Sequence, residues 1–571
     1  MRNVWRNLAI VFFVLALLVG TLFGDRLLAV PDQTRSDLRA YTELMQMAHA
    51  HYGVEVTYRD LVYASIRGML RSLDPHTSFL SPEDFDNMRQ RQQASFYGLG
   101  ILVSMRNGQL TIRTPIEGTP AWRLGLRAGD IIHTIEGEPT DSMGLDDAIS
   151  RLKGPKGTSV DITILRRGLD EPLPLTVTRA EIPQTTVRFA YMLKPDTGYI
   201  RITDFARSTA NEVRTALESL REQGMERLIL DLRSNGGGLL DQAVEASAHF
   251  VPVGEQIVET RGRVSDANQS YSASGGDVEP LAMPLMVLVN SGTASAAEIL
   301  SGAIQDHDMG LVLGTPTWGK GLVQTVYNLS FGAGVALTTA KYYTPAGRLI
   351  QRDYSSFFDY YTHFDNASSE DADADADAAP ADGDATTERD DAPPAEAFTT
   401  DLGRTVYGGG GITPDILVEP ERVPAMMQFL FARNAFFTFA VDLHDASPVT
   451  DPNWQPASDL IERFSTWLVA EELADEADVT ELFADEEAGE IAQRQIHSDL
   501  LNAAFGTEAS HRVLAEGDAQ IQAALTYFDE AADLLRRRQS GEPLPVLGQL
   551  ELPNAAVSVD GGGGPAPQPE D

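Results

Sequence analysis

The spacing of hydrophobic and polar positions changes along the chain and divides it into segments of different predicted structure. In residues 31–95 apolar side chains recur at helical spacing, as at Leu38 and Tyr41. In residues 96–182 short alternating runs such as Val160–Ile164 lie between glycine turns, a pattern typical of half-buried strands. The chain therefore predicts an N-terminal helical region followed by a small β-rich domain with short helices.

Residues 183–352 alternate between buried strands and helices. The runs Leu228–Leu232 and Leu285–Val289 are apolar throughout or nearly so and have the length of strands, while Ala210–Gln223 is amphipathic. Such alternation predicts a largely parallel sheet covered by helices, which we expect to be completed by residues 401–420.

The remaining segments are distinguished by composition. Residues 353–400 contain a tract rich in Asp, Ala and Pro with little to bury, and we expect a disordered acidic insertion. A solvated spacer is favoured over a dedicated binding tail as its role. Residues 421–545 read as helical and residues 546–571 as a flexible tail. The predicted fold class is a multidomain α/β protein with helical regions at both ends of a β-rich domain and an α/β core.

Composition excludes several functions. A formal charge of −39 over 571 residues argues against binding nucleic acid through its phosphates, which requires an excess of Lys and Arg. The chain has no cysteine, which excludes disulfides, a thiol nucleophile and cysteine metal sites. No paired His and acidic pattern indicates a catalytic metal, so we expect neither a metal nor another cofactor.

The N-terminus has the pattern of a membrane-targeting segment within residues 1–30. Arg2 and Arg6 precede the apolar run Leu8–Gly24, which as a helix would be about 25 Å long, slightly short of a bilayer core. No clear cleavage site follows, so an uncleaved signal anchor in the inner membrane is favoured over a removed signal peptide. The positive charges would keep the N-terminus in the cytoplasm and direct the body outward, into a periplasm. The alternative is a buried helix of the fold.

Three polar residues suggest the chemistry. Ser295 begins a helix directly after a buried strand, where unpaired N–H groups and the helix dipole favour a developing anion. Lys320 lies between two glycines and would act as a base if burial lowered its pKa. Gln324 shares a face with Lys320 and would orient its amine. Alone, Ser295 would be a helix cap and Lys320 a surface lysine, but together they predict a serine hydrolase with a lysine base.

These motifs resemble those of the C-terminal processing peptidases, also called tail-specific proteases, from about residue 35 to residue 420. The stretches that carry the resemblance occur in order and, besides the segments of Ser295 and Lys320, are Gly68–Leu70, Leu73–His76, Gly98–Ile101, Ala128–Asp130, Asp231–Gly238, Lys341–Arg348 and Gly411–Asp415. The resemblance implies Ser295 as nucleophile, Lys320 as general base and Gln324 as its orienting residue. It also implies an oxyanion hole made by the backbone N–H groups of Gly237 and Ala296.

Asp306 has two possible roles. It occupies a position at which some members of the family carry an important aspartate, and a structural salt bridge explains it equally well. His307 and His76 are the alternatives to Lys320 as the base. His307 lies about three helical turns beyond Ser295, and His76 belongs to a recurrent family motif without a catalytic role, so neither is expected to serve.

Residues 96–182 resemble a PDZ domain, a module that adds a peptide to a sheet edge and binds its terminal carboxylate. The resemblance implies that the loop formed by Gly98, Leu99, Gly100 and Ile101 binds this carboxylate through backbone N–H groups. The expected partners are therefore protein substrates recognised by their C-termini. The alternative is a structural domain that no longer binds peptide.

The sequence thus predicts an extracytoplasmic serine endopeptidase that cleaves proteins after its PDZ domain binds their C-termini. The alternative from another class is a catalytically silent PDZ-containing peptide-binding scaffold, and a third reading is a Ser–Lys amidase or esterase acting on small molecules. The helical residues 421–545 offer a surface for self-association or for an adaptor, or simply pack on the core.

Overall fold

The computed structural model describes residues 32–106, 108–169, 171–275, 280–354 and 396–542. The expected anchor of residues 1–30, most of the acidic insertion and the tail of residues 546–571 lie outside the described residues. Within the described part, no helix combines the length and the apolar character needed to cross a membrane. The chain divides into two compact units, one made of residues 1–81 and 326–337 and the other of residues 82–325 and 338–571.

The first unit contains two helices and a short strand. Helix α2 is Asp32–His51, and α3 (Tyr58–Arg71) starts at a capping box in which Thr57 and Asp60 bond each other's backbone N–H. Strand β1 (Ser78–Leu80) pairs antiparallel with the start of β18 (Gly334–Tyr343), and Leu70, Phe79 and Ala333 form a small core. The helical spacing did not predict β1, because three residues are too few to show alternation.

The β-rich domain belongs to the second unit. Its sheet runs β3-β4-β5-β7-β8, with β6 paired to β5, and β2 pairs β9 where the chain enters and leaves the domain. Leu110, Ile112, Ile132 and Ile164 are fully buried in its core. The elements are β2 Ser95–Gly98, β3 Ile101–Arg106, β4 Gln109–Pro115, α5 Pro120–Arg123, β5 Ile131–Ile135, β6 Glu138–Pro139, α6 Leu145–Leu152, β7 Ser159–Leu165, β8 Leu173–Thr178 and β9 Ala180–Pro183, preceded by α4 Pro82–Gln92.

The α/β core is built on a sheet in the order β10-β11-β12-β15-β16-β21. The first pair is antiparallel and the later pairs are parallel, which confirms the predicted largely parallel sheet. Apolar residues of α7, α8 and α9 pack on one face of it. The elements are β10 Val187–Lys194, β11 Thr197–Ile202, α7 Thr209–Glu222, β12 Arg227–Asp231, α8 Leu240–Ser247, β15 Leu285–Val289, α9 Ala296–Asp306, β16 Leu311–Gly314 and β21 Ile416–Leu417.

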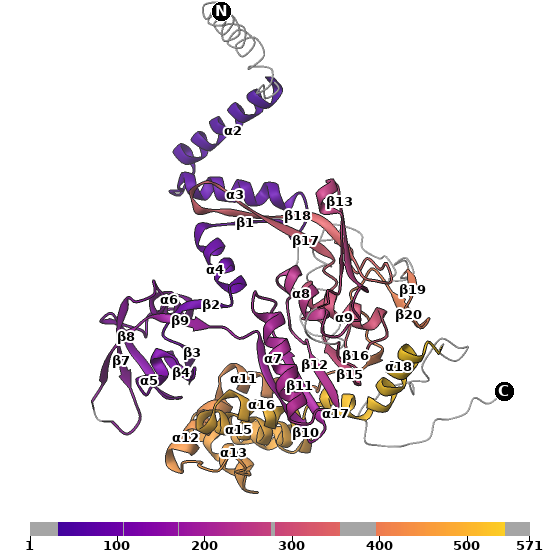
Figure 1. Ribbon diagram of the computed structural model, residues 1–571. Helices are drawn as coiled ribbons and strands as arrows, with labels where there is room; N and C mark the ends of the chain where they lie inside the picture. Colours follow the sequence, from indigo (N-terminus) through magenta and orange to yellow (C-terminus); the bar gives the residue numbers. More distant parts are fainter. Residues whose placement is uncertain (1–31, 107, 170, 276–279, 355–395, 543–571) are drawn as a thin grey trace, which may run out of the picture. The chain divides into compact units, whose positions relative to one another are not determined.

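The last two helices cover the opposite face of this sheet (Figure 1). Ile521 and Ala524 of α17 (Ala519–Thr526) and Leu534 of α18 (Phe528–Ser540) share a core with Tyr199 and Met286. The preceding helices form a separate apolar core of their own. They are α11 Ala425–Ala432, α12 Ala435–Ala446, α13 Leu460–Ala470, α14 Glu476–Leu482, α15 Glu486–Phe505 and α16 Thr507–Glu516. Part of the C-terminal helical region therefore packs on the core, which is one of the roles predicted for residues 421–545.

An antiparallel sheet that the sequence pattern did not predict also contributes to the second unit. Strand β13 (Gln256–Gly262) pairs β14 (Gln269–Ser272) on one side and the later part of β18 on the other. Strand β17 (Leu322–Asn328) pairs β18 as well and follows Lys320 directly. A further hairpin joins β19 (Ala397–Thr399) to β20 (Thr405–Tyr407).

Candidate active site

Ser295 stands at the entrance of a buried helix in an unfavourable backbone conformation. Strand β15 ends at Val289, and after a short turn Ser295 is the N-cap of α9, all of whose residues are buried. The φ and ψ angles of Ser295 are 56° and −116°, in a region that residues other than glycine rarely adopt. Such local strain persists only where the surrounding structure enforces it, and it is concentrated at functional sites.

A glycine-rich turn lies directly against Ser295. Gly237 has a φ of 98°, and a Cβ atom added there would lie 2.7 Å from Ser295 Cβ and 2.9 Å from the Ala296 nitrogen. The Ala296 N–H makes no hydrogen bond within the described part of the chain, whereas the Gly237 N–H donates to Asn235 Oδ1 at 2.9 Å. The two backbone donors expected to form an oxyanion hole are therefore neighbours, and one of them is already engaged.

Lys320 lies in a loop that leads into β17, and Gln324 lies on that strand. Both side chains are half-buried, and Lys320 Nζ donates a hydrogen bond to Gln324 Oε1 at 3.1 Å. The loop makes a close approach at Gly319, whose φ is 86° and where a Cβ would lie 3.0 Å from the Gly411 nitrogen. A side chain at that position would push the loop away from its neighbour.

The carboxylate of Glu298 joins the Ser295 and Lys320 segments. Glu298 is fully buried in the first turn of α9 and accepts hydrogen bonds from the backbone N–H groups of Ser295 (2.7 Å), Gly319 (2.7 Å) and Lys320 (3.0 Å). The hydroxyl of Thr317 donates to it as well, at 2.5 Å. Burial raises the pKa of Glu298, and these hydrogen bonds, which favour the carboxylate, oppose that shift.

Tyr342 makes a second connection between the same two segments. Its hydroxyl lies 2.6 Å from the carbonyl oxygen of Lys320, to which it donates, and 3.0 Å from that of Ser295. Neither Glu298 nor Tyr342 was predicted from the sequence. The signal for Glu298 was present, since a serine followed three residues later by glutamate is the pattern of a capping box. Nothing in the spacing of Tyr342 indicated its contact.

Asp306 lies at the other end of α9 and is part of a buried ion pair. It pairs with the guanidinium of Arg348, which is fully buried, and accepts the Ala346 N–H at 2.9 Å. The neighbouring His307 contacts Asp401 through Nδ1 at 2.9 Å and the Gln256 carbonyl oxygen through Nε2 at 2.7 Å. Both residues therefore take part in contacts that hold the core together.

His307 also belongs to a group with metal-ligating side chains. Ligand atoms of Glu255, His307 and Asp401 lie within 4.8 Å of one another. The guanidinium of Arg538 is already paired with both carboxylates, at 2.5 Å from Glu255 Oε1 and 2.9 Å from Asp401 Oδ2. A cationic side chain from α18 thus neutralises the acids that would hold a metal ion, and the group fits a metal poorly.

In the β-rich domain the predicted carboxylate-binding loop leads into β3. Within the described strands β3 lies at one edge of its sheet, as addition of a peptide strand requires. The N–H groups of Leu99 and Gly100 donate to no other described residue, and Gly100 has a φ of 81°. Thr119 stabilises the loop, because its hydroxyl donates to the Gly100 carbonyl oxygen at 3.1 Å.

A strained serine at the N-terminus of a buried helix, packed against a glycine turn, is an arrangement suited to a serine hydrolase, and comparisons with known proteins place the chain among serine peptidases. Residues 196–354 match the model of peptidase family S41, and residues 111–166 match that of the PDZ domain. The carboxy-terminal-processing protease of Bartonella bacilliformis is 37% identical over 324 residues, which cover 56% of this chain and 74% of that protein. The chain belongs to the carboxy-terminal-processing proteases and is a serine peptidase with a PDZ domain.

Further relatives are similar in sequence. The carboxyl-terminal-processing protease of Synechocystis sp. is 40% identical over 295 residues, which cover 50% of this chain and 68% of that protein. Among solved structures, the photosystem II D1 C-terminal processing protease is 33% identical and matches 54% of this chain and 83% of its own, with a TM-score of 0.32. The PDZ domain of the carboxy-terminal protease from Vibrio cholerae, solved with a peptide, is 33% identical over 15% of this chain and 97% of its own, with a TM-score of 0.15.

Proposed function

We propose that this protein is an endopeptidase in which Ser295 is the nucleophile, Lys320 the general base and Gln324 the residue that orients the lysine amine. Ser295 Oγ attacks the scissile carbonyl carbon, and its proton passes to a neutral Lys320 Nζ. The C–N bond then breaks, and the leaving amine takes that proton. Water attacks the carbonyl carbon of the resulting acyl-enzyme and gives a proton to Lys320. Lys320 passes this proton to Ser295 Oγ as the C–Oγ bond breaks, which restores the serine and releases the new carboxyl group.

The observation that carries this proposal is the pair of contacts that bind the two catalytic segments to each other. Glu298 accepts N–H groups from both Ser295 and Lys320, and the Tyr342 hydroxyl contacts a carbonyl oxygen of each. A nucleophile and its base must be held within hydrogen-bonding reach during the reaction, and buried polar contacts between their backbones serve that end.

The proposed oxyanion hole uses the N–H groups of Ala296 and Gly237. Ala296 is the first residue of α9, where an unpaired N–H and the helix dipole both favour negative charge. The Gly237 donor is shared with Asn235 Oδ1 and would turn toward the oxyanion as charge develops there. Asp306 is proposed as a structural support for α9 through its ion pair with Arg348.

The proposed substrates are proteins with accessible C-terminal tails. The tail would pair with the edge strand β3, and its carboxylate would be bound by the loop from Gly98 to Ile101, where glycines let N–H groups converge. The apolar run Leu8–Gly24 preceded by arginines supports action outside the cytoplasm, with the chain anchored in the inner membrane.

The test is cleavage of a folded protein that carries an unstructured apolar C-terminal tail. The wild type is expected to shorten or degrade it, and Ser295→Ala is expected to reduce the rate by at least about a thousandfold. Equal rates in the two proteins would contradict the assignment of Ser295. A wild type that binds the tail without cutting it would indicate the peptide-binding scaffold, and one that hydrolyses only small esters or amides would indicate the third reading.

A further inference from the structure

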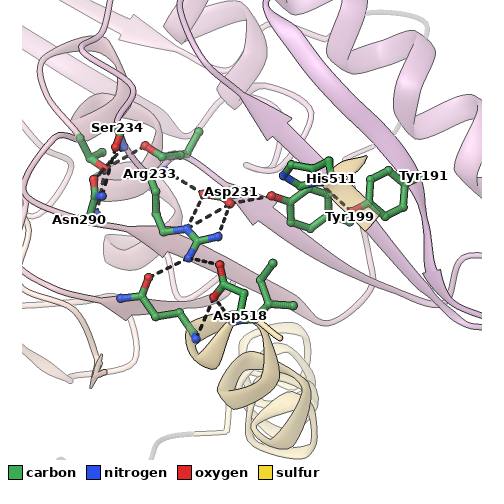
Figure 2. Close-up of polar contacts among 12 residues, drawn as sticks. Tyr191, Tyr199, Asp231, Arg233, Ser234, Asn290, His511 and Asp518 are labelled. Carbon is green, nitrogen blue, oxygen red and sulfur yellow. Dashed lines mark hydrogen bonds and ion pairs between the residues drawn. The ribbon is translucent and has the colours of Figure 1, made fainter. Parts of the chain in front are cut away.

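Arg233 begins the segment that contains Gly237, and it contacts Asp518 beside the C-terminal helices (Figure 2). It lies two residues beyond the end of β12, and its Nη2 donates to Asp231 Oδ2 at 2.7 Å. On its other side, Nη1 donates to Asp518 Oδ2 at 2.8 Å and to Gln520 Oε1 at 2.9 Å. Burial disfavours the charge of Asp231, but Arg233 outweighs it and lowers the pKa of that carboxyl to about 2.

The segment that begins at Arg233 continues to Ser295. Ser234 has a φ of 59°, and its N–H donates to Asn290 Oδ1 at 2.7 Å, so this backbone is held at its first residues. Asn235 is fully buried, donates to the Ile202 carbonyl oxygen at 2.9 Å and accepts the Gly237 N–H. Because Gly237 touches Ser295, a displacement of Arg233 would be passed along a short and constrained backbone to the nucleophile.

We propose that Asp518 is a positioning residue for the hydrolytic reaction, which acts through Arg233 to hold residues 233–238 against Ser295. Asp231 fixes one edge of the guanidinium, and Asp518 fixes another, so that the two acids together determine where Arg233 lies. The C-terminal helices thereby contribute to the geometry of the active site in addition to covering the sheet. This inference rests on the proposed function.

The two carboxylate oxygens of Asp518 accept hydrogen bonds from different groups, so the helix cap and the contact with Arg233 can be changed separately. Oδ1 caps α17 by accepting the N–H groups of Gln520 at 2.9 Å and Ile521 at 3.0 Å, while Oδ2 accepts from Arg233. Asparagine caps helices about as well as aspartate. The variant Asp518→Asn therefore retains the helix cap and removes the negative charge that faces Arg233.

The matched control is Asp485→Asn, which makes the same exchange at the N-cap of α15. Asp485 accepts the Glu487 N–H at 3.1 Å on an exposed surface and does not contact the Arg233 segment. For both variants we would measure kcat and KM on the tailed protein substrate, the rate at which a fluorophosphonate labels Ser295, and the melting temperature.

Asp518→Asn is expected to lower kcat and the labelling rate together by about tenfold, since a hydrogen bond to a charged group is lost, with KM within about twofold of the wild type. Asp485→Asn is expected to change neither rate. Asp518→Ser, which also caps a helix without a charge, should repeat the loss if Asp518→Asn folds poorly. A lowered melting temperature with unchanged kcat and labelling in these variants would overturn the proposal. A wild type that neither cleaves nor reacts would instead refute the proposed function itself.

Discussion

The sharpest prediction concerns Gly237, because its neighbour Gly236 provides a control one residue away. A Cβ at Gly237 would meet Ser295 Cβ at 2.7 Å, the Ala294 carbonyl oxygen at 2.8 Å and the Ala296 nitrogen at 2.9 Å. These atoms are backbone or directly attached to it, so they cannot turn aside as the end of a flexible side chain would. A Cβ at Gly236 would meet nothing within 4 Å.

The magnitude follows from two costs. Overpacking a tightly filled site costs about 1–3 kcal/mol, and a left-handed backbone costs a residue with a Cβ about 1–2 kcal/mol. Gly237→Ala therefore carries a local penalty of about 2–5 kcal/mol, which the turn can relieve only by moving away from Ser295. Since loss of one oxyanion donor costs about a hundredfold or more in kcat, we expect Gly237→Ala to lower kcat by at least about a hundredfold.

The assay is steady-state cleavage of the tailed protein by the wild type, Gly237→Ala and Gly236→Ala, with melting temperatures measured in parallel. Gly236→Ala is expected to keep kcat within about threefold of the wild type, because its added methyl group enters open space. If Gly237→Ala also kept kcat within about threefold, the close approach of the turn to Ser295 would not matter to the reaction, and the reasoning would be refuted.

Other predictions follow from single buried groups. Glu298→Gln leaves at least one of the N–H or O–H donors around it without an acceptor. Each donor left unpaired destabilises the fold by about 1–3 kcal/mol, so both kcat and the melting temperature should fall. Unchanged values would contradict the connecting role of Glu298. Asp306→Asn leaves Arg348 buried without its carboxylate and should lower the free energy of unfolding by about 3–5 kcal/mol in denaturant titrations, whereas a loss below about 1 kcal/mol would argue against a structural role. Burial lowers the pKa of His511 to about 4. The free energy of unfolding therefore contains a contribution from neutral His511 that is complete above about pH 6.5 and is lost as the pH falls through about 4. This contribution is at most about 3 kcal/mol. His511→Asn should remove this part of the pH dependence of unfolding. A tail peptide with a free C-terminus should bind at least about tenfold more tightly than its amidated form in fluorescence anisotropy, and equal affinities would rule out carboxylate recognition by the loop from Gly98 to Ile101.

Local sequence signals predicted the larger part of the fold. Apolar runs such as Leu285–Val289 and the amphipathic segment Ala210–Gln223 are long enough to reveal buried strands and a surface helix, and the structure has β15 and α7 there. Strand β1 and the sheet around β13 and β18 were missed, because short or mixed-polarity strands do not stand out from loops.

The residues of the candidate site likewise include some that local sequence signals predict and others that they do not. Ser295, Lys320 and Gln324 could be proposed from the sequence, because their residue types and joint spacing suggest chemistry. Tyr342 and Arg348 were not, since their contacts join segments that only the folded chain brings together. The link from Asp518 to Arg233 spans 285 positions and could be recognised only from the structure. Long-range polar contacts of this kind depend on tertiary packing and leave no local periodicity.

The most direct test of the account is the rate at which a fluorophosphonate labels the serine, measured by intact mass for the wild type, Ser295→Ala and Lys320→Met. The account predicts one adduct on the wild type and none on Ser295→Ala. Lys320→Met should label at least about a hundredfold more slowly while still binding the tail peptide. Labelling of Lys320→Met at the wild-type rate would contradict the central claim that Lys320 activates Ser295.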